Sequence, residues 1–156
     1  MSEHIVIIEW KRNQAKFIDN KYSREHTWKF DGVEIAASAS PHVVPVPYSN
    51  PACIDPEEAF VASLSSCHML WFLSIAAKRK FVVEDYIDKA VGIMEKNENG
   101  HLAITKVYLR PQVTFSLEIP TQEQLETMHH EAHHSCFLAN SVKSEIIIEL
   151  IYSNPK

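Results

Sequence analysis

The residues best suited to chemistry in this 156-residue chain are its three cysteines, Cys53, Cys67 and Cys136. Three thiols do not make a disulfide framework for a chain of this length, and in a reducing compartment such thiols are more often inert, metal-binding or catalytic. Cys67 and Cys136 stand 69 residues apart, yet the apolar patterns around both direct them into one core. If their Cα atoms lie within about 4.4–6.8 Å, they can form a disulfide without backbone rearrangement. A cytosolic pair of this kind is expected to cycle between thiol and disulfide.

A reactive Cys67 requires a nearby cation, because burial raises the pKa of a thiol and a neutral thiol is a poor nucleophile. Arginine is preferred, since its guanidinium stays charged when partly buried and presents several N–H donors in a fixed plane to a thiolate. The basic residues that precede the cysteine segment are few: Lys11, Arg12, Lys16, Lys21, Arg24 and Lys29.

A carboxylate is then needed to hold the arginine, and Glu57 and Glu58 are close in sequence. Glu57 precedes Cys67 by ten residues, which is about 15 Å along a straight helix. One unbroken helix therefore does not bring both residues to one site. Either its first turn bends back, or Glu57 reaches the cysteine of a partner subunit. We favour the second arrangement, which predicts a homodimer with shared sites.

A second motif, the sequence His-Glu-Ala-His-His at 130–134, matches the H-E-x-x-H pattern of zinc metalloproteases. On a helical wheel, His130 and His134 lie opposite the apolar stripe, where a helix meets water. A catalytic zinc also requires a third protein ligand and a dry cleft, and the sequence indicates neither. We expect a solvated histidine face here and no metal centre, and keep a zinc-dependent hydrolase built on His130, Glu131 and His134 as an alternative function.

The same wheel places Cys136 with the buried stripe or just beyond the helix end.

The segment that positions Cys67 reads as a helix from Asp55 to Leu73. Asp55 can cap it, proline at 56 suits the first helical position, and Glu58 can close a capping box. Residues 69–73 are apolar on every side, which predicts burial all round. His68 follows Cys67 and, as its neighbour on a helix, points away from it.

A membrane span is the competing interpretation of this segment, because residues 59–77 contain no acidic or basic side chain. Four serines and a histidine leave the stretch only moderately apolar, however, and no second candidate span exists. We expect a buried central helix and no membrane contact.

The other elements are expected to be mostly strands. Asp31-Gly32 and residues 97–100 predict hairpin turns. Thr121 with Gln124 predicts a capping box that opens a second helix running toward Cys136. The proline-rich residues 38–54 predict a long irregular loop. Strands are predicted at 4–10, 15–18, 27–30, 33–37, 90–96, 101–108, 113–116 and 144–152. This order indicates a single α+β domain over residues 1–156, with mostly antiparallel pairing.

The net charge and the isoelectric point limit the classes of binding partner that we expect. A net charge of -5 and a pI near 6.0 provide no electrostatic reason to expect nucleic acid or an anionic membrane. The N-terminal residues lack the basic and apolar regions of a secretory signal, so a cytoplasmic location is expected.

Two segments resemble a known family. Residues 55–67, Asp-Pro-Glu-Glu-Ala-Phe-Val-Ala-Ser-Leu-Ser-Ser-Cys, resemble the first cysteine segment of the OsmC/Ohr family, the osmotically inducible and organic hydroperoxide resistance proteins. Residues 136–142, Cys-Phe-Leu-Ala-Asn-Ser-Val, look like the second. The resemblance implies antiparallel sheets packed around a buried central helix, in an intertwined homodimer. It also implies a thiol peroxidase that reduces organic hydroperoxides, is restored by an external dithiol and has no bound cofactor.

Carried over residue by residue, the resemblance makes Cys67 the peroxidatic cysteine, Cys136 the resolving cysteine and Glu57 the carboxylate that orients an arginine. Arg24 is our first choice for that arginine and Arg12 the second. The family usually has proline after the second cysteine, where this chain has Phe137. Cys53 has no counterpart in either motif and is expected to be a spare thiol. A non-enzymatic redox-sensing or ligand-binding module on the same scaffold is a further alternative.

Overall fold

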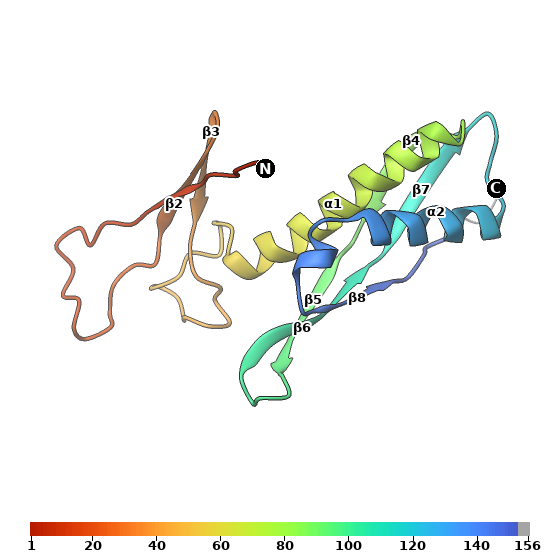
Figure 1. Ribbon diagram of the computed structural model, residues 1–156. Coiled ribbons are helices and arrows are strands. Elements are labelled where there is room, and N and C mark those ends of the chain that lie inside the picture. The colour runs from red at the N-terminus through yellow and green to blue at the C-terminus, as the bar shows by residue number, and fades with distance from the viewer. Residues whose placement is uncertain (153–156) are drawn as a thin grey trace. The chain divides into compact units, whose positions relative to one another are not determined.

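The computed structural model describes residues 1–152 and divides the chain into two compact units, Met1–Ala59 and the residues from Phe60 onward. Figure 1 shows the helices and strands of each unit. Helix α1 (Pro56–Lys78) begins in the first unit and continues into the second. The expectation of one domain over the whole chain stays a prediction.

The first unit contains a three-stranded antiparallel sheet in the order β1 (Ile7–Glu9), β2 (His26–Phe30) and β3 (Val33–Ala37). The predicted hairpin is confirmed: Phe30 pairs with Val33 across a two-residue turn. Gly32 has a φ of 77° there, a backbone conformation that glycine adopts without steric cost.

The strand predicted at 15–18 is wrong, because these residues lie in the loop between β1 and β2, which has turns at 13–14 and 17–20. Asn13 and Gln14 have positive φ angles, which takes the chain out of an extended path before Ala15. Phe17 instead packs its ring against Trp10 and Tyr22. An aromatic cluster in a loop therefore accounts for the apolar residues that suggested a strand.

The start of α1 is as predicted. The backbone amide of Glu58 donates to Asp55 Oδ1 at 2.7 Å, and the amide of Asp55 donates to Glu58 Oε2 at 3.3 Å. These reciprocal bonds satisfy two amides that a helix start otherwise leaves unpaired. Among the described helices, α1 alone has the length and composition of a membrane span, but it fits the core helix of a soluble protein.

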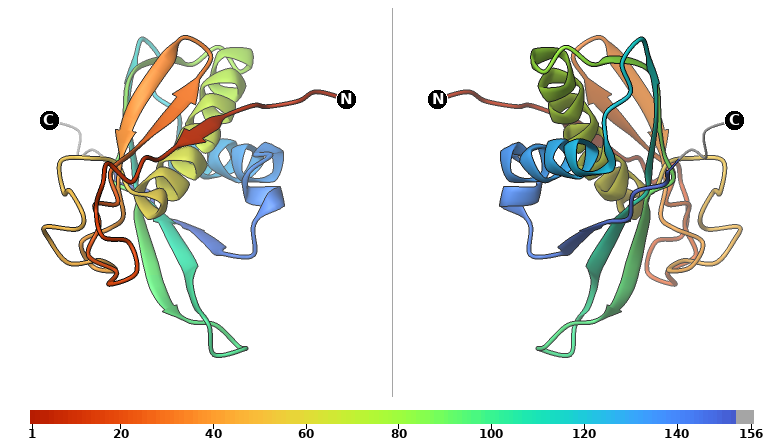
Figure 2. Two further views of the ribbon diagram at one scale, coloured as in Figure 1. Left: turned by 90° about the vertical axis from the view of Figure 1, so that its left-hand side faces the viewer. Right: turned by 90° about the vertical axis from the view of Figure 1, so that its right-hand side faces the viewer.

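The second unit has two small sheets. One pairs β4 (Val82–Asp88) with β7 (Pro111–Ser116), antiparallel. The other has the order β5 (Val91–Lys96), β6 (Leu102–Leu109) and β8 (Glu145–Ile148), with β5–β6 antiparallel and β6–β8 parallel. Helix α2 (Gln122–Ser135) and the 3-10 helix η1 (Ala139–Ser141) lie between β7 and β8. In both views of Figure 2, α1 and α2 lie on one side of these strands.

Two details of the sheets differ from the prediction. Strand β4 was not predicted, because its acidic residues and a bulge between Val83 and Asp85 break the alternation that marks a strand. Strand β7 begins at Pro111, two residues before the predicted start at 113, and the first position of a strand tolerates a proline.

Helix α1 joins two apolar clusters in this unit. Phe72 and Ala76 pack with Met128 and Ala132 of α2, and Leu64 packs with Val107 and Leu109 of β6. Helix α1 also lies close to the backbone of β5, because a Cβ atom added at Gly92 would lie 2.6 Å from Val61 Cγ2. The prediction that α1 is buried all round between 69 and 73 is wrong for the single chain, because Leu70 is 61% exposed.

A buried histidine pair joins the two helices. His68 Nε2 lies 2.9 Å from His129 Nδ1, and both side chains are buried. The ring of Phe72 stacks on that of His129 at 4.1 Å between centroids. Burial lowers the pKa of His68 to about 4 and of His129 to about 3, with smaller contributions from the charges of His133 and His68, respectively. Both imidazoles are therefore neutral in the folded protein at neutral pH.

This pair predicts a loss of stability in mild acid. The unfolded chain takes up protons on both histidines below about pH 6.5, whereas the folded chain resists until about pH 4 and pH 3. The free energy of unfolding should therefore fall with pH below 6.5, by up to about 1.4 kcal/mol per pH unit for each histidine. Urea unfolding measured from pH 7.5 to 5 tests this.

The matched control is the double variant His68→Leu/His129→Leu, which removes both partners together, so that neither imidazole is left without the other. Its stability should depend much less on pH between 6.5 and 5. An equally steep dependence in this variant would assign the effect to other groups, His133 first, because burial lowers its pKa too.

Candidate functional site

The structure brings Cys67 and Cys136 together. Cys67 lies in the middle of α1, and Cys136 is the residue that ends α2. The two thiols lie close enough for Cys67 to raise the pKa of Cys136, and both are free rather than joined in a disulfide. Two sulfur atoms from distant parts of the sequence thus form one dithiol within the second unit.

The environments of the two thiols differ. Cys136 is 1% exposed, and its sulfur also accepts the backbone amide of Ala139 at 3.4 Å. Burial and the contact with Cys67 raise the pKa of Cys136 to about 11, and neither lysine nor arginine contributes to that shift. Cys136 is therefore a neutral thiol at neutral pH, whereas Cys67 is partly exposed.

Cys67 opens into a groove of about 550 Å³ between α1 and the segment after α2. Leu70 and Trp71 line its α1 side, and Phe137 and Leu138 line the other. The rings of Trp71 and Phe137 meet edge to face at 5.5 Å. Serines at 63, 66 and 74 complete the lining. The groove thus presents one thiol to solvent between apolar walls.

Glu57 lies in the first turn of α1. Because α1 runs without a break from Pro56 to Lys78, its first turn does not bend back toward Cys67. The Glu57 atom Oε2 is buried and has no hydrogen-bond partner in the described chain. A buried carboxylate oxygen of this kind is costly to leave unpaired.

Both candidate arginines are held by the loop between β1 and β2. Arg24 donates from Nη1 to the carbonyl of Asn20 at 2.9 Å and from Nη2 to Asn20 Oδ1 at 2.7 Å, and its guanidinium lies 3.8 Å from the centre of the Tyr22 ring. Arg12 donates to the carbonyl of Ala15 at 2.6 Å. Within residues 1–152, neither arginine forms an ion pair with a carboxylate.

The histidine motif lies on the exposed face of α2. His130 Nε2 and His134 Nε2 are 3.1 Å apart, and Glu131 is paired with Arg79 at 2.6 Å. No group of three or more His, Cys, Asp or Glu side chains suited to a metal ion is found in the described residues. The third ligand that a catalytic zinc requires is therefore missing there, and no observation favours the hydrolase.

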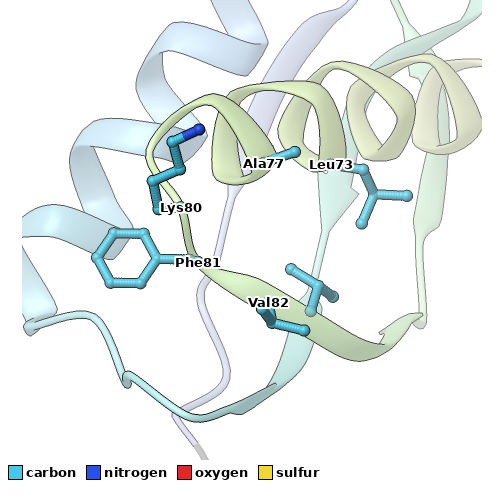
Figure 3. A pocket seen from close by; sticks show the side chains of 6 residues that line it. Leu73, Ala77, Lys80, Phe81 and Val82 are labelled. Atoms are coloured by element: carbon cyan, nitrogen blue, oxygen red, sulfur yellow. The ribbon is translucent and has the colours of Figure 1, made fainter.

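A second groove, of about 470 Å³, lies at the other end of α1 and contains no cysteine. Figure 3 shows Leu73 and Ala77 of α1 facing Val82 at the start of β4, with Lys80 and Phe81 at the connection. Cys53 lies elsewhere, in the proline-rich loop of the first unit, where burial and then the charge of Glu25 raise its pKa.

Sequence reasoning missed the groove-lining role of Phe137 and Leu138 and the burial of His129. Phe137 drew attention only as a departure from the family's proline. His129 stands beside the H-E-x-x-H motif and falls next to Met128 and Ala132 on a helical wheel, which is the signal that indicates its burial.

Comparison with known proteins supplies the context of this site. A family model described as OsmC-like protein matches residues 49–151. The structure of an OsmC-like protein of unknown function from Vibrio cholerae is 62% identical in sequence, with a TM-score of 0.95, covering 97% of this chain and 100% of that one. A comparison with curated proteins found no match.

Two organic hydroperoxide resistance proteins share the fold. The one from Elizabethkingia anophelis is 21% identical, with a TM-score of 0.65 over 85% of this chain and 90% of its own. The one from Bacillus subtilis is 16% identical, with a TM-score of 0.63 over 96% and 98%. The α+β fold with antiparallel sheets and two helices, the family match over both cysteine segments and the Vibrio cholerae relative together show that this chain belongs to the OsmC-like protein family.

Proposed function

We propose that this protein is a cysteine-based peroxidase that reduces organic hydroperoxides through Cys67 and Cys136. The observation that carries the proposal is the contact between two free thiols of which only Cys67 opens into a groove. The names of the two structural relatives from Elizabethkingia anophelis and Bacillus subtilis agree with this class of activity.

The reaction takes three steps. The Cys67 thiolate attacks the distal peroxide oxygen, the O–O bond breaks, and the alkoxide leaves as an alcohol after taking a proton, so that Cys67 becomes a sulfenic acid. The Cys136 thiol then condenses with this sulfenic acid, which forms the disulfide and releases water. An external dithiol reduces the disulfide through two exchange steps and is itself oxidised to a cyclic disulfide.

The environments of the two thiols support this order. A buried thiol with a pKa of about 11 is a poor first nucleophile, and the groove reaches Cys67. The apolar walls of the groove suit the carbon chain of an organic hydroperoxide. Arg24 would stabilise the Cys67 thiolate and the charge that develops on the leaving oxygen.

The site is completed in a homodimer, in which Glu57 of one protomer holds the arginine beside Cys67 of the partner subunit. Three observations support this: α1 is unbroken, a buried oxygen of Glu57 lacks a partner in the described chain, and apolar side chains such as Leu70 and Val82 remain exposed. A second copy of the chain would cover this apolar surface.

Substitution of each cysteine separates their roles. Cys67→Ser should reduce hydroperoxide turnover to the uncatalysed rate, because the serine hydroxyl is not an effective nucleophile toward peroxide. Cys136→Ser should consume one equivalent of hydroperoxide and leave a sulfenic acid on Cys67. Peroxide consumption with a lipoyl dithiol measures the turnover of Cys67→Ser. Peroxide consumption and the intact mass without a dithiol measure the single oxidation of Cys136→Ser, because a dithiol would itself reduce the sulfenic acid.

The matched control is Cys53→Ser, which removes the remaining thiol and should turn over like the wild type. Catalytic turnover in Cys67→Ser would rule out the mechanism. A disulfide that forms in the wild type without multiple turnover with a dithiol would indicate a redox sensor instead.

Arginine substitution identifies the activating cation. Arg24→Lys should lower kcat/KM for hydroperoxide by about 10²–10³ and should move the alkylation of Cys67 to higher pH, because lysine does not reproduce the planar pair of donors. Arg12→Lys should change neither. The reverse result would assign the role to Arg12, and no effect from either would remove both from the site.

Subunit mixing tests the shared site. Cys67→Ser and Glu57→Gln should each have low activity alone. If Glu57 completes the site of the partner subunit, a refolded equal mixture should recover roughly a quarter of the wild-type activity, since half of the dimers are mixed and each has one intact site. No recovery on mixing would show that Glu57 and Cys67 do not act across the dimer.

A further inference from the structure

We propose that His130 and His134 form a binding site for one divalent transition-metal ion on the exposed face of α2, separate from the dithiol. The first observation is distance. The two Nε2 atoms lie 3.1 Å apart, within hydrogen-bonding distance of each other, and a bound ion would replace this contact. Metal–nitrogen bonds of about 2.0–2.1 Å place two ligand nitrogens about 2.9 Å apart at a right angle and about 3.3 Å apart at a tetrahedral angle. The observed separation lies between these values.

The second observation is the inclination of the rings. Their centroids are 4.4 Å apart, whereas the two Nε2 atoms are 3.1 Å apart. Two imidazoles that met head-on would have centroids much farther apart than their nitrogens. The two imidazoles are therefore not aligned head-on, and their planes are inclined at 78°.

The surroundings favour a cation and leave room for it. His130 and His134 are one helical turn apart on a regular helix, so that the backbone fixes their spacing. The end of this helix is held by the side chain of Asn140, whose Nδ2 donates to the carbonyl of His134 at 3.0 Å. Glu126, one turn before His130, lines the same shallow groove as His130 and adds negative charge. Water would fill the remaining coordination positions.

The chemistry of the two donors selects the ion. Imidazole nitrogens suit Zn²⁺, Ni²⁺ and Cu²⁺, with Cu²⁺ the tightest by the usual order of stabilities. The site is structural rather than hydrolytic, because Glu131, the base in metalloproteases with this motif, is paired with Arg79. An ion here would clamp the last turn of α2, which ends at Cys136.

Titration of the reduced wild-type protein with Ni²⁺ tests the proposal by calorimetry and by thermal unfolding. We expect one Ni²⁺ per chain and a rise in the midpoint of unfolding, since an ion that binds only the folded state stabilises it. Both His130→Asn and His134→Asn should weaken binding at least tenfold and remove the thermal shift. These side chains are exposed, and far-ultraviolet circular dichroism checks that the variants fold.

Two controls separate this site from other donors. His101→Asn removes an exposed imidazole elsewhere and should leave Ni²⁺ binding unchanged, and Cys67→Ser should do the same. An equal loss in His101→Asn would mean non-specific binding to surface histidines. A loss confined to Cys67→Ser would place the ion at the dithiol, and unchanged binding in His130→Asn would also overturn the proposal. None of these results depends on peroxidase activity.

Discussion

The contact between His68 and His129 connects the two helices that supply the dithiol. Cys67 is the residue before His68 on α1, and Cys136 ends the helix that contains His129. A hydrogen bond between two buried neutral imidazoles is directional, so it fixes how α1 meets α2 more narrowly than apolar packing alone. The rings stack within the same cluster as Phe72 and Met128. The positions of the two sulfur atoms depend on this packing.

The dithiol itself is asymmetric, and this asymmetry gives each cysteine a different chemical role. Burial keeps the Cys136 thiol protonated, whereas Cys67 meets solvent through an apolar groove. A nucleophile requires access and a thiolate, while a resolving thiol requires only contact with its partner. The second unit by itself brings the two thiols together and opens Cys67 to the groove. No lysine or arginine contributes to the pKa of Cys136. In the proposed site, the cation that stabilises the Cys67 thiolate therefore comes from the first unit of a second copy of the chain.

Helix α2 shows how neighbouring histidines acquire different properties from their position on a helix. His129 faces α1, where burial lowers its pKa to about 3, and His130 faces solvent, where it meets His134. A rotation of about 100° between consecutive residues separates the two environments. One short run of histidines therefore contributes both to the core and to the exposed face of α2.

The sequence by itself determined the local features: the capping boxes at Asp55 and Thr121, the hairpin turn at Gly32, the order of most strands and the resemblance of the two cysteine segments. These features depend on residues within a few positions of one another, so their physical causes are visible in the sequence. Strand β4 could not be predicted because a bulge and acidic residues disturb the alternation of apolar and polar residues. Residues 15–18 were wrongly predicted to form a strand because an aromatic cluster in a loop is as apolar as a strand. Only the tertiary structure decided that the thiols of Cys67 and Cys136 touch, that Phe137 lines the groove and that His68 pairs with His129. Each of these contacts joins residues of separate elements, and the packing of α1 against α2, rather than any local pattern, sets their distances.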